Sequence, residues 1–217
     1  MSKIGNIFLV WRKGPGSRRI PVGVIKKNIT LGTRFVYIQE NLEQAKNLGF
    51  IPYTGFPDMN KEYYENVIDI FAQRLSKSER NDLADFYSFW KVNSANIVDS
   101  YYMLAQTQGF LPIDNFEFLA DFNPERGLNF ITEIAGLSKT KIPSYEITIG
   151  DKLTYDLDPK NKFDKFAVKV YKNELLIGYV KLIHSRVFYK VKTKIDITVH
   201  HIERNGILNR VFIEISL

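Results

Sequence analysis

The 217-residue chain is long enough to bury a core as one large or two small domains, and 45% of its residues are hydrophobic. It contains no cysteine, which excludes disulfides, thiolate metal ligands and cysteine nucleophiles, and we expect a cytoplasmic protein. There is no apolar run of about 18 residues and no basic segment followed by an apolar one, so we expect neither a membrane span nor a signal peptide.

The net charge of +6 lies mainly in the C-terminal part of the chain. Residues 128–217 carry 15 Lys and Arg against 10 Asp and Glu, whereas residues 1–127 carry 15 against 14. A basic C-terminal module beside a nearly neutral N-terminal one favours an anionic partner for the C-terminal module. A lysine-rich soluble surface without such a partner explains the same excess, and charge alone does not separate the two interpretations.

The N-terminal pattern is typical of a β-hairpin. Apolar runs at 7–11 and 20–25 flank the turn residues 13–17, and the alternating segment 33–39 predicts a third strand. The glycines of this turn are not a phosphate-binding loop. That motif ends in Gly-Lys-Ser/Thr and opens a helix, whereas this segment opens a strand.

Three helices are predicted after these strands. Apolar residues recur at helical spacing in segments 60–77, 78–91 and 95–106, and Gly109 closes the third helix. The aromatic stripes in these segments are typical of a hydrophobic core rather than of a cofactor site.

Strand patterns replace helical ones from residue 115 onward. A turn at 123–127 precedes an extended stretch at 127–137, and 181–192 is the one helical candidate in this region. Six short β-branched segments separated by turns predict a small barrel or curled sheet: 146–149, 152–157, 167–172, 175–180, 195–202 and 210–217.

The expected fold class is therefore α+β, in two domains. Residues 1–122 form a β-hairpin or sheet with about three helices. Residues 123–217 form a small all-β barrel.

The segment 158–180 combines turn residues with two phenylalanines and several lysines. It reads Asp-Pro-x-Asn-x-Phe-Asp from residue 158, then Ala-Val-x-Val from 167 and Ile-Gly-Tyr-Val from 177. This order and spacing resemble the HIRAN domain, a small β-barrel module. The resemblance extends from about residue 131 to residue 217.

The resemblance implies that the barrel grips the 3′ end of single-stranded DNA. By position, we expect Asn161 and Asp164 to bond the terminal sugar and hydroxyl, and Phe163 to stack on the terminal nucleotide. The residue after the family's glycine also contacts DNA, which here is Tyr179, with Lys181 close behind.

Two departures from the family pattern bear on specificity. Phe163 replaces a tyrosine and so lacks its hydroxyl, and Ser138 and Lys139 stand where the family has an Arg-Tyr pair. We therefore expect general single-strand binding more than recognition of a terminal hydroxyl. Lys139, Lys160 and Lys162 add an attraction that depends on salt and not on sequence.

Turn chemistry alone also accounts for this corner. Asn161 and Asp164 are residue types that satisfy local backbone N–H groups, and Lys160, Lys162 and Lys165 can simply be solvated. The two interpretations predict different hydrogen-bond partners for these side chains.

Residues 1–122 resemble, more weakly, the first subdomain of HipA-like proteins. The resemblance rests on Val-Gly-x-Ile at 22–25, Phe-x-Tyr at 35–37, Phe-Pro at 56–57 and the segment 70–82. It implies an alternative function, a regulatory or protein-interaction subunit of a bacterial toxin–antitoxin or phage-conflict system. Such a subunit could dock a Hip-type kinase through Phe89 or Tyr102.

The sequence contains no recognisable catalytic centre. His200 and His201 are neighbours in a predicted strand, where side chains point to opposite faces, so we expect no shared metal site. We expect no cofactor and no enzymatic activity, and a nuclease is the least supported alternative. The sequence therefore predicts a non-enzymatic DNA-binding protein.

Overall fold

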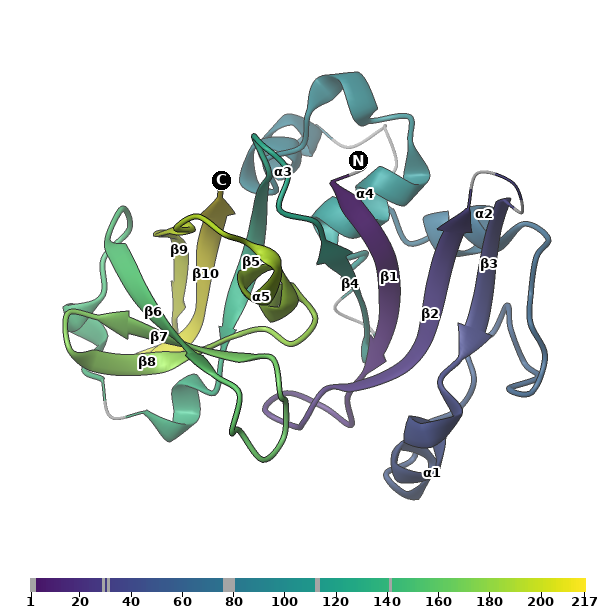
Figure 1. Ribbon diagram of the computed structural model, residues 1–217, viewed down its shortest axis with the longest axis horizontal. Helices are drawn as coiled ribbons and strands as arrows, with labels where there is room; N and C mark the ends of the chain where they lie inside the picture. Colours follow the sequence, from purple (N-terminus) through teal and green to yellow (C-terminus); the bar gives the residue numbers. More distant parts are fainter. Residues whose placement is uncertain (1–2, 29, 31, 76–80, 112–113, 141) are drawn as a thin grey trace. The chain divides into compact units, whose positions relative to one another are not determined.

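Strand pairing and helix packing divide the chain into two units, which the computed structural model describes for residues 3–28, 30, 32–75, 81–111, 114–140 and 142–217 (Figure 1). The N-terminal unit is Ile4–Asp121. The barrel unit combines Phe122–Leu217 with Lys3 near the N-terminus. The α+β fold class predicted from the sequence is confirmed.

A four-stranded sheet in the order β3-β2-β1-β4 forms the framework of the N-terminal unit. The predicted hairpin and third strand are confirmed, because β1 pairs antiparallel with β2, and β2 with β3. The strand bounds are β1 Ile4–Trp11, β2 Ile20–Asn28, β3 Gly32–Tyr37 and β4 Phe116–Phe122.

The helices of this unit are shorter than their sequence patterns predicted. Helix α2 spans only Val67–Ala72, because Tyr63 pairs with Phe35 of β3 as an isolated β-bridge and Asn66 has a φ of 51°. Residues 76–80, which belong to two predicted helices, lie outside the described part of the chain. The remaining helices are α1 Gln39–Asn47, which was not predicted, α3 Leu83–Phe89, and α4 Ser100–Thr107 after a 3₁₀ turn at Ser94–Asn96.

Aromatic side chains fill the core between this sheet and its helices. The rings of Phe35, Phe56 and Phe71 lie 4.8 to 5.2 Å apart, and Phe71 also meets Phe118 of β4 at 4.9 Å. All four side chains are buried, so the aromatic residue of α2 belongs to the core as predicted.

A buried arginine lies at the edge of this core. Arg74 donates hydrogen bonds to the Asp114 carboxylate, with Nη2 2.8 Å from Oδ1, and to the carbonyl oxygen of Gly109 at 2.9 Å. Its guanidinium also lies 5.5 Å from the Phe118 ring centroid. The charge of Asp114 is thus compensated from inside the unit.

The C-terminal unit is a closed barrel with the strand order β10-β5-β8-β7-β6-β9. The predicted barrel is confirmed, with one change in its membership. Strand β5 takes the place of the strand that was predicted at 146–149. Segment 146–149 forms no strand, and its first residue is the last residue of a 3₁₀ turn at Ser144–Glu146. The strand bounds are β5 Asn129–Ala135, β6 Lys152–Asp158, β7 Ala167–Lys172, β8 Leu175–Val180, β9 Asp196–Arg204 and β10 Leu208–Ser216.

A short helical segment packs against the barrel. The helical prediction for 181–192 is confirmed over a 3₁₀ turn, His184–Arg186, and helix α5, Val187–Lys190. Phe188 is buried, and its ring meets that of Tyr155 on β6 at 4.8 Å.

A bulge in β9 changes the expected geometry of the histidine pair. Phe212 pairs with His201 and Ile213 with Val199, so His200 is an extra residue in the strand. Both histidines are half-exposed, and the bulge interrupts the regular alternation on which the expectation of opposite faces was based. Within the described ranges, no group of three or more potential metal-ligating side chains occurs.

Closure of the barrel between β5 and β8 requires a glycine. Gly178 has a φ of +147°, and a Cβ atom built on it would lie 2.5 Å from the Ala135 carbonyl oxygen. That oxygen belongs to the backbone, so it cannot move aside as the end of a flexible side chain could.

We predict that Gly178→Ala lowers the free energy of unfolding by about 2–5 kcal/mol, because it adds backbone strain and a steric clash at the β5–β8 seam. Urea denaturation followed by circular dichroism measures this change. Gly14→Ala is the control, because nothing lies within 4 Å of its Cβ position. Equal stability of the two variants would contradict the requirement for glycine at the seam.

Candidate nucleic-acid interface

The loop between β6 and β7 is closed by the side chain of Asn161. Its Oδ1 accepts hydrogen bonds from the backbone N–H groups of Phe163, at 3.0 Å, and Asp164, at 3.3 Å. Its Nδ2 donates to Asp158 Oδ2 at 3.1 Å. The Asp164 Oδ1 atom in turn accepts from the Phe166 N–H at 2.8 Å. Both predicted ligand side chains are therefore engaged in the loop, and their contact with a strand end stays a prediction.

This hydrogen-bonded loop carries an aromatic ring into solvent. Phe163 is 69% exposed, and Lys160, Lys162 and Lys165 around it are exposed as well. An exposed phenylalanine among lysines is unusual on a protein surface, because transfer of the ring out of water favours burial.

The next aromatic residue, Phe166, lies in a mixed aromatic and cationic cluster. Its ring meets that of Tyr189 edge-on at 5.4 Å, and the cations of Arg186 and Lys165 lie 5.4 and 5.2 Å from its centroid. Tyr189 donates a hydrogen bond to the Ala167 carbonyl oxygen at 2.8 Å, and its partial burial raises its pKa.

Sequence reasoning missed Arg186 and Tyr189 as neighbours of this loop. Both lie in the segment that was recognised as helical, but its packing against the β6–β7 loop is a tertiary contact. The sequence does contain one indication of such a neighbour. The loop holds two phenylalanines, and the less exposed of the two needs other side chains to cover it.

The outer wall of the barrel extends this surface from the loop. Lys169 of β7 pairs across the sheet with Tyr179 of β8, and its Nζ lies 3.5 Å from Asp158 Oδ2. The nearby Asp158 carboxylate raises the pKa of Lys169. Tyr179 is half-exposed beside Gly136, and Lys139 is exposed at the end of the 3₁₀ turn Leu137–Lys139 that follows this glycine.

Lys181 requires a correction. It was expected to present its ammonium group to a phosphate, but it is only 2% exposed, and its Nζ lies 3.3 Å from Glu133 Oε2. Arg210 of β10 also contacts this carboxylate, with Nε 3.4 Å from Oε1. The charge of Lys181 therefore balances a buried acid.

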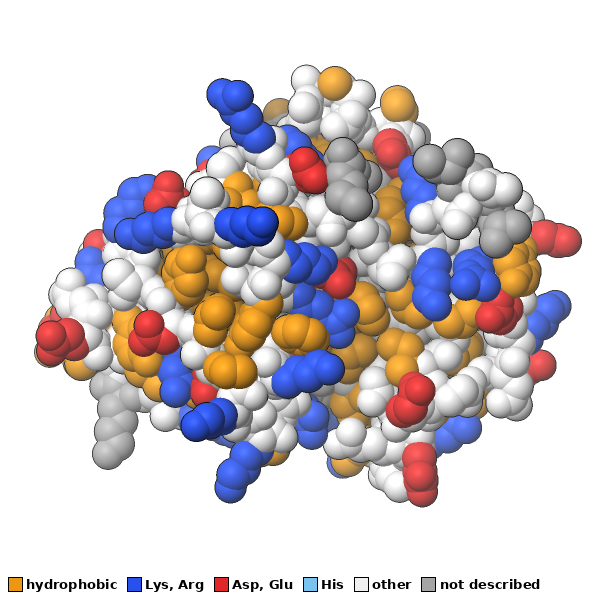
Figure 2. Space-filling view, in the orientation of Figure 1, with side chains coloured by type: hydrophobic (Ala, Val, Ile, Leu, Met, Phe, Trp, Pro, Cys, Tyr) orange, Lys and Arg blue, Asp and Glu red, His pale blue; other side chains and the backbone are white. Residues whose placement is uncertain are grey.

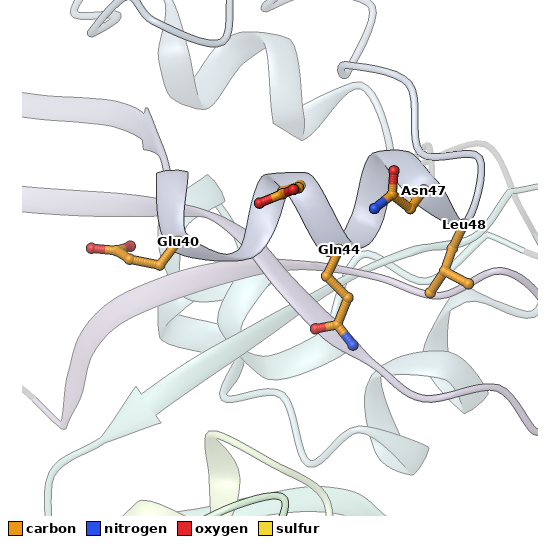
Figure 3. Close-up of a pocket in the computed structure, with 5 residues that line it drawn as sticks. Glu40, Gln44, Asn47 and Leu48 are labelled. Atoms are coloured by element: carbon orange, nitrogen blue, oxygen red, sulfur yellow. The ribbon is translucent and has the colours of Figure 1, made fainter.

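The charge on the molecular surface distinguishes the barrel from helix α1. Figure 2 shows hydrophobic side chains on the barrel bordered by Lys and Arg side chains. A hollow at α1 instead contains two carboxylates, and its lining residues are Glu40, Glu43, Gln44, Asn47 and Leu48 (Figure 3). The acidic hollow repels a polyanion, so the barrel surface is the better candidate for one.

The residues expected to dock a protein partner lie on two helices of the N-terminal unit. Phe89 of α3 is half-exposed beside Trp90, with ring centroids 5.1 Å apart. Tyr102 of α4 is also half-exposed, and its hydroxyl accepts a hydrogen bond from the Asn93 N–H at 2.8 Å. Docking of a partner on these side chains stays a prediction.

We predict that Asn161→Ala destabilises the β6–β7 loop by about 1–2 kcal/mol, because two backbone N–H groups lose their acceptor. Hydrogen exchange at the Phe163 and Asp164 amides should accelerate, and Lys162→Ala, which removes an exposed side chain of the same loop, should preserve the protection. Unchanged exchange in the Asn161 variant would show that Asn161 does not hold the loop.

No helix in the described ranges is long and apolar enough to cross a bilayer. No protein-family model matches the chain, and no curated protein matches it. Among solved structures, the chain is similar to the crystal structure of the HIRAN domain of human HLTF, at 18% identity. The match covers 40% of this chain and 74% of that one, with a TM-score of 0.33. At this identity and superposition the likeness assigns neither a family nor a function to the chain.

Proposed function

We propose that the barrel unit is a non-enzymatic module that binds single-stranded DNA or DNA ends. The observation that carries this proposal is the ring of Phe163, 69% exposed on a loop closed by its own side chains. A nucleobase can stack on such a ring whatever its identity, and each stacked base contributes about 1–3 kcal/mol.

The loop holds the backbone that carries this ring. Asn161 and Asp164 each accept backbone hydrogen bonds that order the residues on either side of Phe163. A ring that is ordered before binding loses less conformational entropy when a strand stacks on it. Asn161 is thus proposed as a positioning residue for Phe163.

The surrounding charges suit a polynucleotide with a free end. Lys160, Lys162 and Lys165 are exposed around the ring and attract phosphates in a salt-dependent manner. The carboxylate of Asp164 in the same loop repels a phosphate but accepts a hydrogen bond from a hydroxyl. A terminal hydroxyl of the strand is such a donor, which favours an end over an internal nucleotide.

We predict that Phe163→Ala weakens single-strand binding by about 5- to 150-fold, the factor that corresponds to a loss of about 1–3 kcal/mol of stacking. Fluorescence anisotropy with labelled strands bearing a 3′ hydroxyl or a 3′ phosphate, and with blunt duplexes, measures the affinity at fixed salt. Tyr145→Ala is the control, because Tyr145 is 76% exposed on the same unit but outside the loop.

Equal losses in the Phe163 and Tyr145 variants would contradict stacking at the loop. Binding of single strands no tighter than that of a duplex closed by a hairpin at each end, which has no free end, would contradict the proposed ligand. A preference for the 3′ hydroxyl over the 3′ phosphate is expected if Asp164 accepts the terminal hydroxyl.

We also predict different effects for two lysines. Lys162→Ala should make the slope of log affinity against log salt less steep by about 0.7, since one phosphate contact is lost. Lys181→Ala should leave this slope unchanged but lower the stability of the barrel by about 3 kcal/mol or more, because Glu133 loses a buried partner. Salt titrations and urea denaturation measure the two effects, and the reverse assignment would contradict the account.

A further inference from the structure

The connection between α5 and β9 is a short basic segment. Residues 190–194 read Lys-Val-Lys-Thr-Lys, with three cations and no acidic residue. Helix α5 ends at Lys190 and β9 begins at Asp196, so most of the segment lies outside helix and strand. Connections favour Gly, Pro, Asn, Asp and Ser, and clustered like charges repel one another. Joining the two elements therefore does not explain the composition of this segment.

The segment is held at both of its ends. At the first end, Lys190 Nζ donates a hydrogen bond to the Phe122 carbonyl oxygen at 3.1 Å. At the other end, Ile195 is buried, and its N–H donates to the Tyr155 hydroxyl oxygen at 3.4 Å. One of the three lysines thus has a structural role in anchoring the segment.

The other two lysines, Lys192 and Lys194, are exposed. In the part of the chain that the structure describes, neither ammonium group forms an ion pair or a hydrogen bond. Exposed carboxylates occur in the adjoining strands, on Asp156 of β6 and Asp196 of β9, but neither of them contacts a lysine of this segment. The charge of the two lysines is therefore solvated rather than balanced by a direct contact, and it can attract an anion in solution with screening by salt.

The pairing of β9 with β6 places these lysines toward the β6–β7 loop. The two strands are antiparallel, with Ile197 opposite Leu153 and Thr198 opposite Lys152. Moving back along the chain from Ile197 thus corresponds to moving forward along β6. The bond from Ile195 to the Tyr155 side chain follows the same direction. The residues before β9 therefore lie alongside the second half of β6, which leads into the loop that carries Phe163.

We propose that Lys192 and Lys194 bind phosphates of the nucleotides next to the one that stacks on Phe163. The inference rests on the proposed function and extends its site from a strand end to a length of strand. The other direction from the loop, across β7, offers Lys169, but the ammonium group of Lys169 already lies 3.5 Å from Asp158 Oδ2. The cations without such a contact are on the β9 side, so the strand is expected to follow that side.

The test is the salt dependence of single-strand binding by the full chain carrying Lys192→Ala and Lys194→Ala. Loss of two phosphate contacts should make the slope of log affinity against log salt less steep by about 1.4, which is about 25-fold weaker binding at about 0.1 M salt. The control is Lys46→Ala with Lys61→Ala, which removes two exposed cations of the N-terminal unit and should leave the slope unchanged. Both double variants should unfold close to the wild-type temperature, since the substituted side chains are exposed.

A third substitution tests whether the segment and the loop contact different phosphates. Lys162→Ala added to the Lys192 and Lys194 variant should raise the total change in slope to about 2.1, because three separate contacts are then lost. A total change no larger than that of the double variant would contradict separate contacts.

The outcomes separate this inference from the function proposed for the barrel. If the wild-type protein binds strands and Phe163→Ala weakens binding, but the Lys192 and Lys194 variant keeps the wild-type slope, only the inference about this segment is overturned. Equal slope changes in this variant and its control also overturn it, because the effect would then follow net charge alone. No strand binding by the wild-type protein overturns both proposals. Binding to phosphatidylserine vesicles that requires the two lysines, with the wild-type slope for strands, would assign the segment to a lipid surface instead.

Discussion

The hydrogen bonds of the Asn161 side chain are the constraint on which the proposed surface of the barrel depends. They join Asp158, at the end of β6, to the N–H groups of Phe163 and Asp164. Asp158 also pairs with Lys169, whose neighbour across the sheet is Tyr179. The backbone that carries the exposed ring and the outer wall of the barrel are thus linked through one carboxylate, and this backbone is held before any ligand arrives.

The barrel uses its cations in two different ways. Lys181 lies beside Glu133 in a buried group that also includes Arg210, and it contributes to the fold. The lysines of the β6–β7 loop remain in water, where the proposed function assigns them a long-range attraction to phosphates. In the N-terminal unit, Arg74 and Arg19 likewise compensate internal carboxylates. The number of Lys and Arg residues in the chain therefore overstates the positive charge that is available to a ligand, because some of these cations balance buried carboxylates.

Most strands could be predicted from the alternation of apolar and polar residues. The elements that were predicted wrongly or missed have local physical causes. Segment 146–149 was predicted as a strand because it has β-branched residues. However, Arg204 donates hydrogen bonds to the carbonyl oxygens of Ser144 and Ile147, and the Asp151 side chain accepts one from the Thr148 N–H. These side chains hold the backbone of the segment outside the sheet. Helix α1 was missed because it buries only Leu42 and Ala45 and shows little apolar periodicity. For the site, the exposure of Phe163 agrees with the sequence interpretation. The burial of Lys181 and the position of Arg186 depend on contacts between distant segments, which no local pattern contains.

The central claim is that a strand stacks on Phe163 while the loop keeps its free conformation. Its most direct measurement is the NMR spectrum of the full chain, with labelled phenylalanine rings and backbone amides, during titration with a short single-stranded oligonucleotide. The account predicts upfield shifts of the Phe163 ring protons, caused by the ring current of the stacked base, with small changes at the Asn161 and Asp164 amides. Saturable binding that leaves the Phe163 ring resonances unmoved would contradict it.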